Sequence, residues 1–393
     1  MAKLTVRDID LKDKVVLMRA DFNVPQDASL NITDDTRIRA TLPTIKYILE
    51  HGVKKLVLIS HLGRPDGKVV EKYSLRPVSA RLNELLGESI LFLNDCIGEN
   101  IKKSIESAKE RVVLLENLRF HAQEEANDPD FSKQLASLGE IFVNDAFGTA
   151  HRAHASTEGV THFLKSAAGF LLEKEIKYLG SVVSNPAKPF MVILGGAKVS
   201  DKIGMIENLL PKADAIIIGG GMAYTFLKAQ GKLIGNSKLE KEKLDLAKSI
   251  LNQAREQHKE ILLPVDNVVV EAIEANAKCE IVGEDIPDGK IAVDIGPKTI
   301  KLFTEKLKSA KTIVWNGPLG IFEMDAFSKG TKEVAGFIAG LNCASIIGGG
   351  DTAAAIAKFK LEDKMTHIST GGGASLEYLE GKILPGVAAL TEK

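Results

Sequence analysis

Arginine and glycine, two residue types suited to binding phosphate, are unevenly divided along this chain. Ten of the eleven arginines lie within the first 152 residues, and only Arg255 comes later. The glycine clusters lie in the second part, at 195–196, 219–221, 348–350 and 371–373. Arginine binds phosphate and carboxylate through paired hydrogen bonds, and glycine after a strand lets backbone amides approach a phosphate closely. The chain is therefore predicted to hold two different anionic ligands and to transfer a group between them.

In the first part, polar residues follow the ends of short apolar runs that are predicted strands. These runs are 15–18, 56–59, 112–115 and 141–143. If the strands are parallel, the residues that follow them meet at one edge of the sheet, where ligands of such folds bind. The basic residues expected to converge there are Arg37, His61, Arg64, Arg119 and Arg152. Such a cluster suits a small ligand that carries phosphate and carboxylate groups.

Each of these residues also has a simpler interpretation. An arginine can pair with a neighbouring acid such as Asp34 or Glu116. Asp21 and Asn23 can form a turn or can accept hydrogen bonds from a ligand hydroxyl. The spacing of His151 and His154 is compatible with a metal site, but no third ligand has a suitable spacing, so this pair is expected to extend the basic patch.

In the second part, the segment 194–202 predicts a phosphate-binding turn. A strand ends, Gly195 and Gly196 turn the chain, and a helix is expected to begin with Ser200 or Asp201 as its cap. On such a helix Lys198 and Lys202, four residues apart, would project on one side and reach one polyphosphate. The alternative is a pair of solvated lysines. No Walker A motif, GxGxxG motif or protein-kinase His-Arg-Asp loop occurs.

A second glycine cluster, 348–350, is expected to open a helix over 353–359. A helix N-terminus attracts anions, so a phosphate would lie beside Asp351, and Mg²⁺ bridging the two negative groups would make that arrangement favourable. The alternative is that Asp351 only caps the helix. After a further predicted strand, Pro318 and Leu319 could stack on a purine while Glu323 accepts the ribose hydroxyls.

Composition limits the classes of function. The chain has 393 residues, 45% hydrophobic and 26% charged, with a net charge of −1. This charge argues against broad binding to nucleic acid or to a membrane. The three cysteines form no CxxC pair and suit a reducing compartment. Neither a secretory signal nor an apolar run of membrane-spanning length is visible, so a cytoplasmic protein is expected.

Strand-like and helix-like segments alternate in both parts, which predicts the α/β class. The expected fold is two Rossmann-like, doubly wound parallel-sheet domains joined by a helix hinge. In the first part, amphipathic helices are expected at 36–50, 77–86 and 130–138. In the second, strands near 191, 216, 261, 313 and 346 alternate with helices that begin near 200, 222, 239, 328 and 352. A helix at 171–179 and a loop with two prolines mark the boundary.

The ordered motifs together resemble one family, phosphoglycerate kinase of the bacterial type. They are found at 19–25, 61–65, 116–120, 144–148, 150–154, 195–199, 315–320 and 348–352, and continue to 371–375. The resemblance implies reversible transfer of the acyl phosphate of 1,3-bisphosphoglycerate to MgADP, giving 3-phosphoglycerate and MgATP. It also implies a monomer that bends at its hinge. The domains expected are 1–170 with 375–393 for the glycerate, 171–189 as the interdomain helix and hinge, and 190–374 for the nucleotide.

The resemblance further implies a role for each matching residue. The glycerate-binding residues are Asp21, Phe22, Asn23, Arg37, His61, Leu62, Gly63, Arg64, Arg119 and Arg152. The nucleotide-binding residues are Gly196, Ala197, Lys198, Lys202, Gly221, Ala292, Asn316, Pro318, Glu323, Gly349, Gly350, Asp351 and Thr352. Asp351 is the residue expected to hold Mg²⁺, and Arg37, Lys198, Lys202, Gly349 and Gly371 are the expected catalytic residues. Ala292 stands where members of the family often carry glycine against the adenine, and its methyl group is expected to tighten that pocket.

Two other classes of protein fit parts of the pattern. A nicotinamide dehydrogenase would also have two α/β domains, but the missing GxGxxG motif counts against it. A non-catalytic anion-binding module would need only one ligand site and does not account for both the arginine and the glycine clusters.

Overall fold

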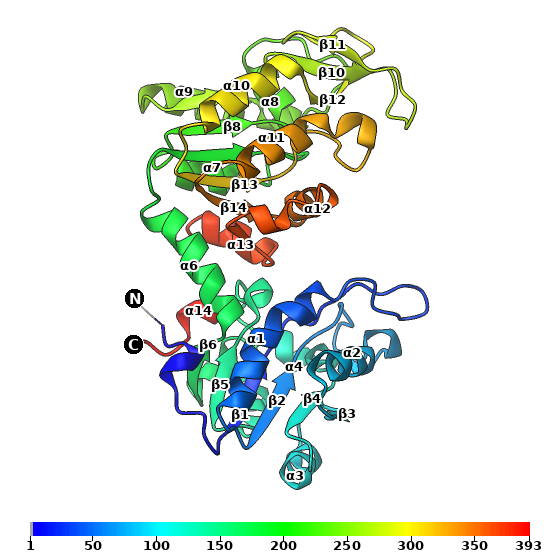
Figure 1. Cartoon of the computed structure of the whole chain (residues 1–393), viewed down its shortest axis with the longest axis vertical. Helices are drawn as coiled ribbons and strands as arrows, with labels where there is room; N and C mark the ends of the chain where they lie inside the picture. The colour runs from blue at the N-terminus through cyan, green and yellow to red at the C-terminus, as the bar shows by residue number, and fades with distance from the viewer. Residues whose placement is uncertain (1–2) are drawn as a thin grey trace. The chain divides into compact units, whose positions relative to one another are not determined.

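The computed structural model describes residues 3–393 and divides into two compact units (Figure 1). The first comprises the residues up to Lys177 together with Ile383–Lys393, and the second comprises Tyr178–Lys382. The chain passes from the first unit to the second within helix α6 (Phe170–Ser184) and returns after Lys382. Each unit is built on its own parallel sheet, so the α/β class with two doubly wound sheets is confirmed.

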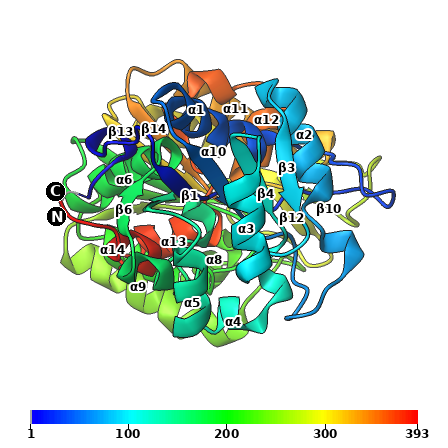
Figure 2. The same ribbon diagram turned by 90° about the horizontal axis from the view of Figure 1, so that it is seen from below.

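The first unit contains a six-stranded parallel sheet in the order β3-β4-β2-β1-β5-β6. Its strands are β1 (Val15–Arg19), β2 (Lys55–Ile59), β3 (Ile90–Leu93), β4 (Val112–Leu115), β5 (Ile141–Asn144) and β6 (Lys165–Ala168). Its helices before α6 are α1 (Thr36–Glu50), α2 (Arg76–Leu86), α3 (Glu99–Ser107), α4 (Ala122–Glu125) and α5 (Pro129–Ala136). Figure 2 shows the same elements from below.

Alternate residues of the central strands point to opposite faces of this sheet, and each face has its own apolar cluster. Val16 and Met18 of β1 pack with apolar residues of α1 and α2, whereas Leu17 packs with residues of α3 and α5. Because both faces are covered, β2 and β4 are uninterrupted runs of buried residues, as expected for a parallel sheet. This packing leaves the carboxyl edge of the sheet for the loops that carry the polar residues.

The second unit repeats this plan with a parallel sheet in the order β15-β14-β13-β7-β8-β9. The strands are β7 (Phe190–Leu194), β8 (Ala215–Ile218), β9 (Glu260–Leu262), β13 (Thr312–Asn316), β14 (Ala344–Gly348) and β15 (His367–Ile368). The helices are α7 (Ile203–Leu209), α8 (Ala223–Ala229), α9 (Leu244–Glu256), α10 (Pro297–Leu307), α11 (Lys329–Ala339), α12 (Gly350–Lys358) and α13 (Gly373–Leu379).

A small antiparallel sheet in the second unit lies outside the regular alternation. It has the order β11-β10-β12, formed by Glu280–Val282, Asn267–Val270 and Ile291–Ile295. The sequence patterns did not predict it. The short strands β3 and β6, the helices α3, α4, α10 and α13, and the exact starts of α7 and α9 were also not predicted.

The last residues complete the first unit. They form α14 (Pro385–Ala388), and the Gly386 amide donates to the Ala150 carbonyl over 2.9 Å. The Asn144 side chain donates to the Gly386 carbonyl at 3.2 Å, and the Ser166 amide donates to the Thr391 hydroxyl at 3.0 Å. The segment thus runs beside the ends of β5 and β6.

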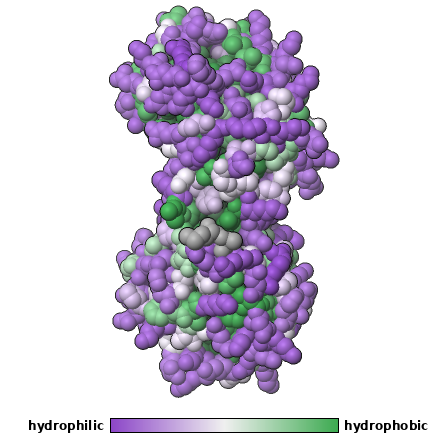
Figure 3. Space-filling view, turned by 90° about the vertical axis from the view of Figure 1, so that its left-hand side faces the viewer, coloured by the Kyte–Doolittle hydropathy of each residue, from purple (hydrophilic) through white to green (hydrophobic). Residues whose placement is uncertain are grey.

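Within residues 3–393, no helix combines the length and the apolar character that a membrane crossing needs. The face drawn in Figure 3 is mainly hydrophilic, with hydrophobic residues in smaller patches.

Candidate functional site

The segments that follow β1, β2, β4 and β5 lie side by side, because these strands are parallel neighbours in the sheet. Contacts between the segments bring several predicted residues together. Arg37 Nη1 donates to Asp21 Oδ2 over 2.7 Å, and the Gly63 amide donates to Asn23 Oδ1 over 2.8 Å. Arg119 Nη1 in turn donates to the Gly63 carbonyl at 3.0 Å. These contacts bring Arg37 and Arg119 to one sheet edge together with Asp21, Asn23 and Gly63.

Two of the predicted residues lie beneath this edge. The side chains of Phe22 and Leu62 are buried in the apolar core, at 0% and 3% exposure. Their backbones hold the loops, since the Phe22 amide donates to Ser60 Oγ at 2.9 Å and the Leu62 carbonyl accepts from Asn117 Nδ2 at 2.7 Å. These two side chains support the loops from below.

The arginines at this edge differ in whether an acidic side chain forms an ion pair with them. Arg37 pairs with Asp21, and Arg119 Nε lies 3.1 Å from Glu125 Oε1. Within residues 3–393, Arg64 and Arg152 form no ion pair with an acid, and Arg152 Nε contacts His151 at 3.2 Å. The acids expected as alternative partners are engaged elsewhere: Asp34 accepts from Thr36, and Glu116 accepts from Ser74 and Leu75. The edge therefore carries unneutralised positive charge.

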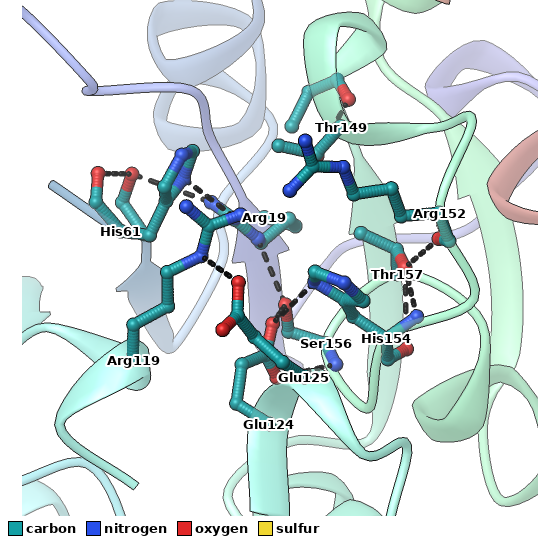
Figure 4. A network of polar contacts seen from close by, with 12 residues as sticks. Arg19, His61, Arg119, Glu124, Glu125, Thr149, Arg152, His154, Ser156 and Thr157 are labelled. Carbon is teal, nitrogen blue, oxygen red and sulfur yellow. Dashed lines mark hydrogen bonds and ion pairs between the residues drawn. The ribbon is translucent and has the colours of Figure 1, made fainter. Parts of the chain in front are cut away.

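A buried network that the sequence patterns did not predict supports the edge (Figure 4). Arg19, at 1% exposure, donates from Nε to Ser156 Oγ at 2.9 Å and from Nη2 to His61 Nδ1 at 3.0 Å. Glu124, also 1% exposed, accepts from Ser156 Oγ at 2.6 Å. The one signal in the sequence for a buried Arg19 is its place at the end of an apolar strand. Glu124 gives no such signal, because it lies in a short acidic run typical of a solvated helix.

Burial sets the charge of the histidines at this edge. The pKa of His61 is held well below its usual value by burial and then by the nearby Arg19 and Arg119. Burial, Arg119 and Arg19 lower the pKa of His154 to about 3. Both rings are neutral near pH 7, so His154 adds no charge to the basic patch that it was expected to extend. Because arginine only donates, His61 Nδ1 is the acceptor of its bond to Arg19 and the ring proton lies on Nε2.

In the second unit, the glycine loops after β7, β13 and β14 surround a cavity of about 340 Å³. Predicted residues that line it are Gly196, Ala197, Lys198, Lys202, Asn316, Gly349, Gly350, Asp351 and Thr352. Gly349 is the N-cap of α12 with φ of 85°, a conformation that favours glycine. The Gly317 amide donates to Thr352 Oγ1 at 2.6 Å, which ties two of the loops together.

An adjoining cavity of about 310 Å³ has a more apolar lining. It shares Gly196, Ala197 and Asp351 with the first cavity. The predicted residues Gly221, Ala292, Pro318 and Glu323 line it together with Tyr224, Ile273, Ile291 and Ile321. Leu319, which was expected to stack on a purine with Pro318, is instead fully buried in the core. The two cavities are therefore neighbours, one with a glycine-rich lining and the other with a more apolar one.

The local structure at 198–202 differs from the expected helix. Helix α7 begins at Ile203, and Lys202 is its N-cap, so neither Ser200 nor Asp201 caps it. The carboxylate of Glu240 accepts hydrogen bonds from the Val199 amide and from Ser200 Oγ, which holds this segment in a turn. Both Lys198 and Lys202 nevertheless line the cavity, and the Lys202 ammonium donates to Asn316 Oδ1. Burial lowers the pKa of Lys202.

Asp351 does not cap its helix. It is the second residue of α12, whose N-cap is Gly349. Its carboxylate lines both cavities and is exposed, which leaves an oxygen donor beside the glycine-rich end. Of the glycine cluster 371–373, Gly372 and Gly373 line the cavity, while the Gly371 amide donates to Ser369 Oγ at 3.2 Å.

Comparison with known proteins identifies the chain's relatives. The family model described as phosphoglycerate kinase matches residues 6–382. The phosphoglycerate kinase of Koribacter versatilis (strain Ellin345) is 58% identical over 406 residues, with 100% of both chains covered. That of Thermosipho africanus (strain TCF52B) is 56% identical over 399 residues, covering 100% of this chain and 99% of the relative.

Solved structures give the same result. The phosphoglycerate kinase from Coxiella burnetii matches with a TM-score of 0.92 and 42% identity, covering 98% of each chain. The one from Pyrococcus horikoshii OT3 matches with a TM-score of 0.84 and 33% identity, also over 98% of each chain. The chain therefore belongs to the phosphoglycerate kinase family.

Proposed function

We propose that the two sites described above hold the two substrates of the phosphoglycerate kinase reaction. The basic edge of the first unit binds 3-phosphoglycerate or 1,3-bisphosphoglycerate, and the double cavity of the second unit binds ADP or ATP. The observation that carries this proposal is the union of a glycine-rich and an apolar cavity through Gly196, Ala197 and Asp351. Such a site matches a molecule with a polyphosphate at one end and a base at the other.

In this proposal the first unit recognises a phosphate and a carboxylate. Arg64 and Arg152 supply charge that no acid within residues 3–393 neutralises, and Arg119 and Arg37 add partly paired guanidinium groups. The neutral His61 presents a polar ring without adding charge. Bidentate arginine contacts are well suited to both anionic groups. Asp21 and Asn23 are proposed to bind the substrate while they also hold Arg37 and Gly63.

In the second unit the polyphosphate would lie against the backbone of the loops at Gly196 and Gly349, beside Lys198 and Lys202. The base would lie in the apolar cavity between Ala292 and Pro318, with the ribose near Glu323. A catalytic role for the Gly371 amide rests on the family resemblance alone, because that amide donates to Ser369.

The residues present fit a magnesium ion that enters with the nucleotide. Asp351 offers a carboxylate oxygen at the glycine-rich end, where it would otherwise repel a phosphate. Carboxylate and phosphate oxygens are the ligands that Mg²⁺ prefers. Bound there, Mg²⁺ would neutralise part of the charge on the phosphates.

The proposed chemistry is a direct in-line transfer. The bond between the acyl oxygen and phosphorus breaks, an oxygen of the ADP β-phosphate forms the new bond, and the carboxylate of 3-phosphoglycerate leaves. No enzyme nucleophile is needed, so the residues act by alignment and by neutralising charge. Arg37 on one side and Lys198 and Lys202 on the other are proposed to stabilise the moving phosphoryl group. The acyl phosphate must be kept from water, so the units are proposed to close around the reactants.

The reaction is proposed to take place in the cytoplasm with the protein as a monomer, without a nucleic acid or membrane partner. The net charge of −1 and the three free cysteines support these surroundings. The test of the function is a coupled assay for ATP formation from 1,3-bisphosphoglycerate and MgADP. Turnover typical of a kinase is expected, and turnover no faster than the spontaneous reaction would overturn the proposal.

A further inference from the structure

A second group of chemically active side chains lies at the carboxyl edge of the first sheet, on its β3 side. Asp95 and Cys96 follow β3, and His121 follows the 3-10 turn Leu118–Phe120 after β4. Strands β3 and β4 are parallel neighbours in register at Leu93 and Leu115. The loops that follow them are therefore brought together, although 24 residues separate Cys96 from His121 in the sequence.

The three side chains can direct one atom each at a common point. One ligand atom from each of Asp95, Cys96 and His121 lies within 4.8 Å of the other two. His121 Nε2 is 2.7 Å from Asp95 Oδ1. In a tetrahedral zinc site, with bonds of about 2.0–2.3 Å, the ligand atoms lie roughly 3–4 Å apart. The cluster therefore needs only a small contraction to reach that geometry.

The surroundings hold the ligands and leave one side open. Cys96 is 1% exposed, so its sulfur is fixed in the core. The His121 ring packs on Phe131 with ring centroids 5.4 Å apart, which limits its orientation. The side chains of Asp95 and His121 are 49% and 27% exposed, so an ion and a water molecule can reach them from solvent.

The set of donor atoms indicates which ion would bind. A thiol sulfur, an imidazole nitrogen and a carboxylate oxygen together suit Zn²⁺, whereas Mg²⁺ prefers oxygen ligands alone. Asp95 Oδ1 accepts from the Cys96 amide at 2.7 Å as well as from His121, and Oδ2 accepts no hydrogen bond within residues 3–393. The carboxylate therefore has an oxygen available for a cation.

We propose that Asp95, Cys96 and His121 form a zinc site with three protein ligands and a water molecule in the fourth position. The site is distinct from the residues proposed to bind the glycerate and the nucleotide. Burial and the carboxylates of Asp95 and Glu124 keep the pKa of the Cys96 thiol well above its usual value. The thiol is therefore protonated in the metal-free protein, and zinc binding releases that proton.

The test uses the full-length chain, treated with a chelator, desalted and free of nucleotide. Co²⁺ is titrated first, because a cobalt–thiolate bond produces a charge-transfer absorption band that oxygen ligands do not. One Co²⁺ per chain with this band is expected, and Zn²⁺ should displace it. If no Co²⁺ binds, or if Co²⁺ binds without this band, Cys96 is not a metal ligand and the proposal is overturned.

Variants locate the ligands. Asp95→Asn and His121→Gln should each weaken zinc binding by at least ~10-fold. Loss of a residue that only hydrogen-bonds to a metal ligand already lowers metal affinity by about 10–100-fold. Both side chains are partly exposed, so the variants should fold, and kinase activity in zinc-free buffer checks that they do. Cys343→Ser is the matched control and should keep the band. An undiminished affinity in both ligand variants, or loss of the band in the control, would contradict the assignment.

Discussion

Arg37 and Asp21 form an ion pair at the carboxyl edge of the first sheet, with Arg37 Nη1 2.7 Å from Asp21 Oδ2. Arg37 lies in the first turn of α1, and Asp21 lies two residues after β1. The Asp21 side chain is 8% exposed and that of Arg37 is 36% exposed. The buried acid therefore orients a guanidinium group that still reaches solvent, which is the arrangement expected of a side chain prepared for an incoming anion.

Replacing Arg37 with alanine is expected to lower the turnover number by about 100-fold or more, with a smaller change in KM. The reason is that the charge is proposed to act mainly on the transition state. Steady-state kinetics with 1,3-bisphosphoglycerate and MgADP measure both constants. Arg39→Ala is the matched control, because Arg39 lies on the same helix but pairs with Asp35. Near-native turnover of Arg37→Ala would refute the catalytic role.

Arg64→Ala and Arg152→Ala are expected to act mainly on binding. Each removes a cation that pairs with no acid within residues 3–393, and a hydrogen bond to a charged group contributes about 1.5–3 kcal/mol. Affinity for 3-phosphoglycerate should fall by roughly 10–100-fold, as measured by isothermal titration calorimetry. Arg76→Ala, which removes a contact with Asn94, should leave the affinity unchanged. If the two binding variants resemble this control, the basic edge is not the glycerate site.

Asp351→Asn is expected to raise the Mg²⁺ concentration needed for half-maximal activity. The substitution keeps the shape of the side chain but removes the negative charge proposed to bind the ion. Helix α12 should stay intact because its N-cap is Gly349, and thermal unfolding would check this. An unchanged magnesium dependence would exclude Asp351 as a magnesium ligand.

Asp145 is expected to make stability depend on pH. Burial raises its pKa from 3.8 to about 7, even though its carboxylate accepts from the Leu171 amide at 2.8 Å. The native state therefore holds this proton more tightly than the unfolded state, so the free energy of unfolding falls as pH rises from about 4 to about 7. A shift of about three units corresponds to at most about 4 kcal/mol.

The measurement is urea unfolding of the wild type and of Asp145→Asn at about pH 5 and about pH 8. The wild type should lose more stability between these values than the variant does. Asp294, whose pKa burial also raises to about 7, is present in both proteins and so cancels from the comparison. Parallel changes in the two proteins would mean that Asp145 does not contribute.

Closure around the reactants predicts a change in size. Reacting atoms must come within roughly 3–3.5 Å, and a ligand shifts a conformational equilibrium only through unequal affinity for its two states. The radius of gyration from small-angle X-ray scattering should fall most with 3-phosphoglycerate and a non-hydrolysable MgATP analogue together, and less with either alone. The same radius of gyration without ligand, with either ligand alone and with both ligands would contradict the closure proposal.

Local patterns were sufficient to predict the central strands and the edges they form. The apolar runs 112–115, 190–194 and 215–218 coincide with β4, β7 and β8, and the amphipathic period of 36–50 coincides with α1. Parallel pairing then places the residues after these strands together, so the arginine edge and the glycine loops could be predicted from strand ends alone.

Other features depend on partners far away in the sequence. The turn at 198–202 replaces a helix because Glu240, about forty residues later, accepts its hydrogen bonds. Arg19 and Glu124 are stabilised in the interior by one another's charge and by Ser156, and no local pattern signals that network. The small sheet of β10, β11 and β12 consists of short strands that periodicity does not distinguish from loops.

The return of Ile383–Lys393 to the first unit has a consequence for biosynthesis. Ala150, Asn144 and Ser166 obtain hydrogen-bond partners from residues that the ribosome adds more than two hundred positions later. The second unit is continuous in sequence, so all of its strands and helices have been synthesised before those partners exist. The unit begun first is thus the unit finished last, and the newly made chain must keep the ends of β5 and β6 uncovered throughout most of its translation.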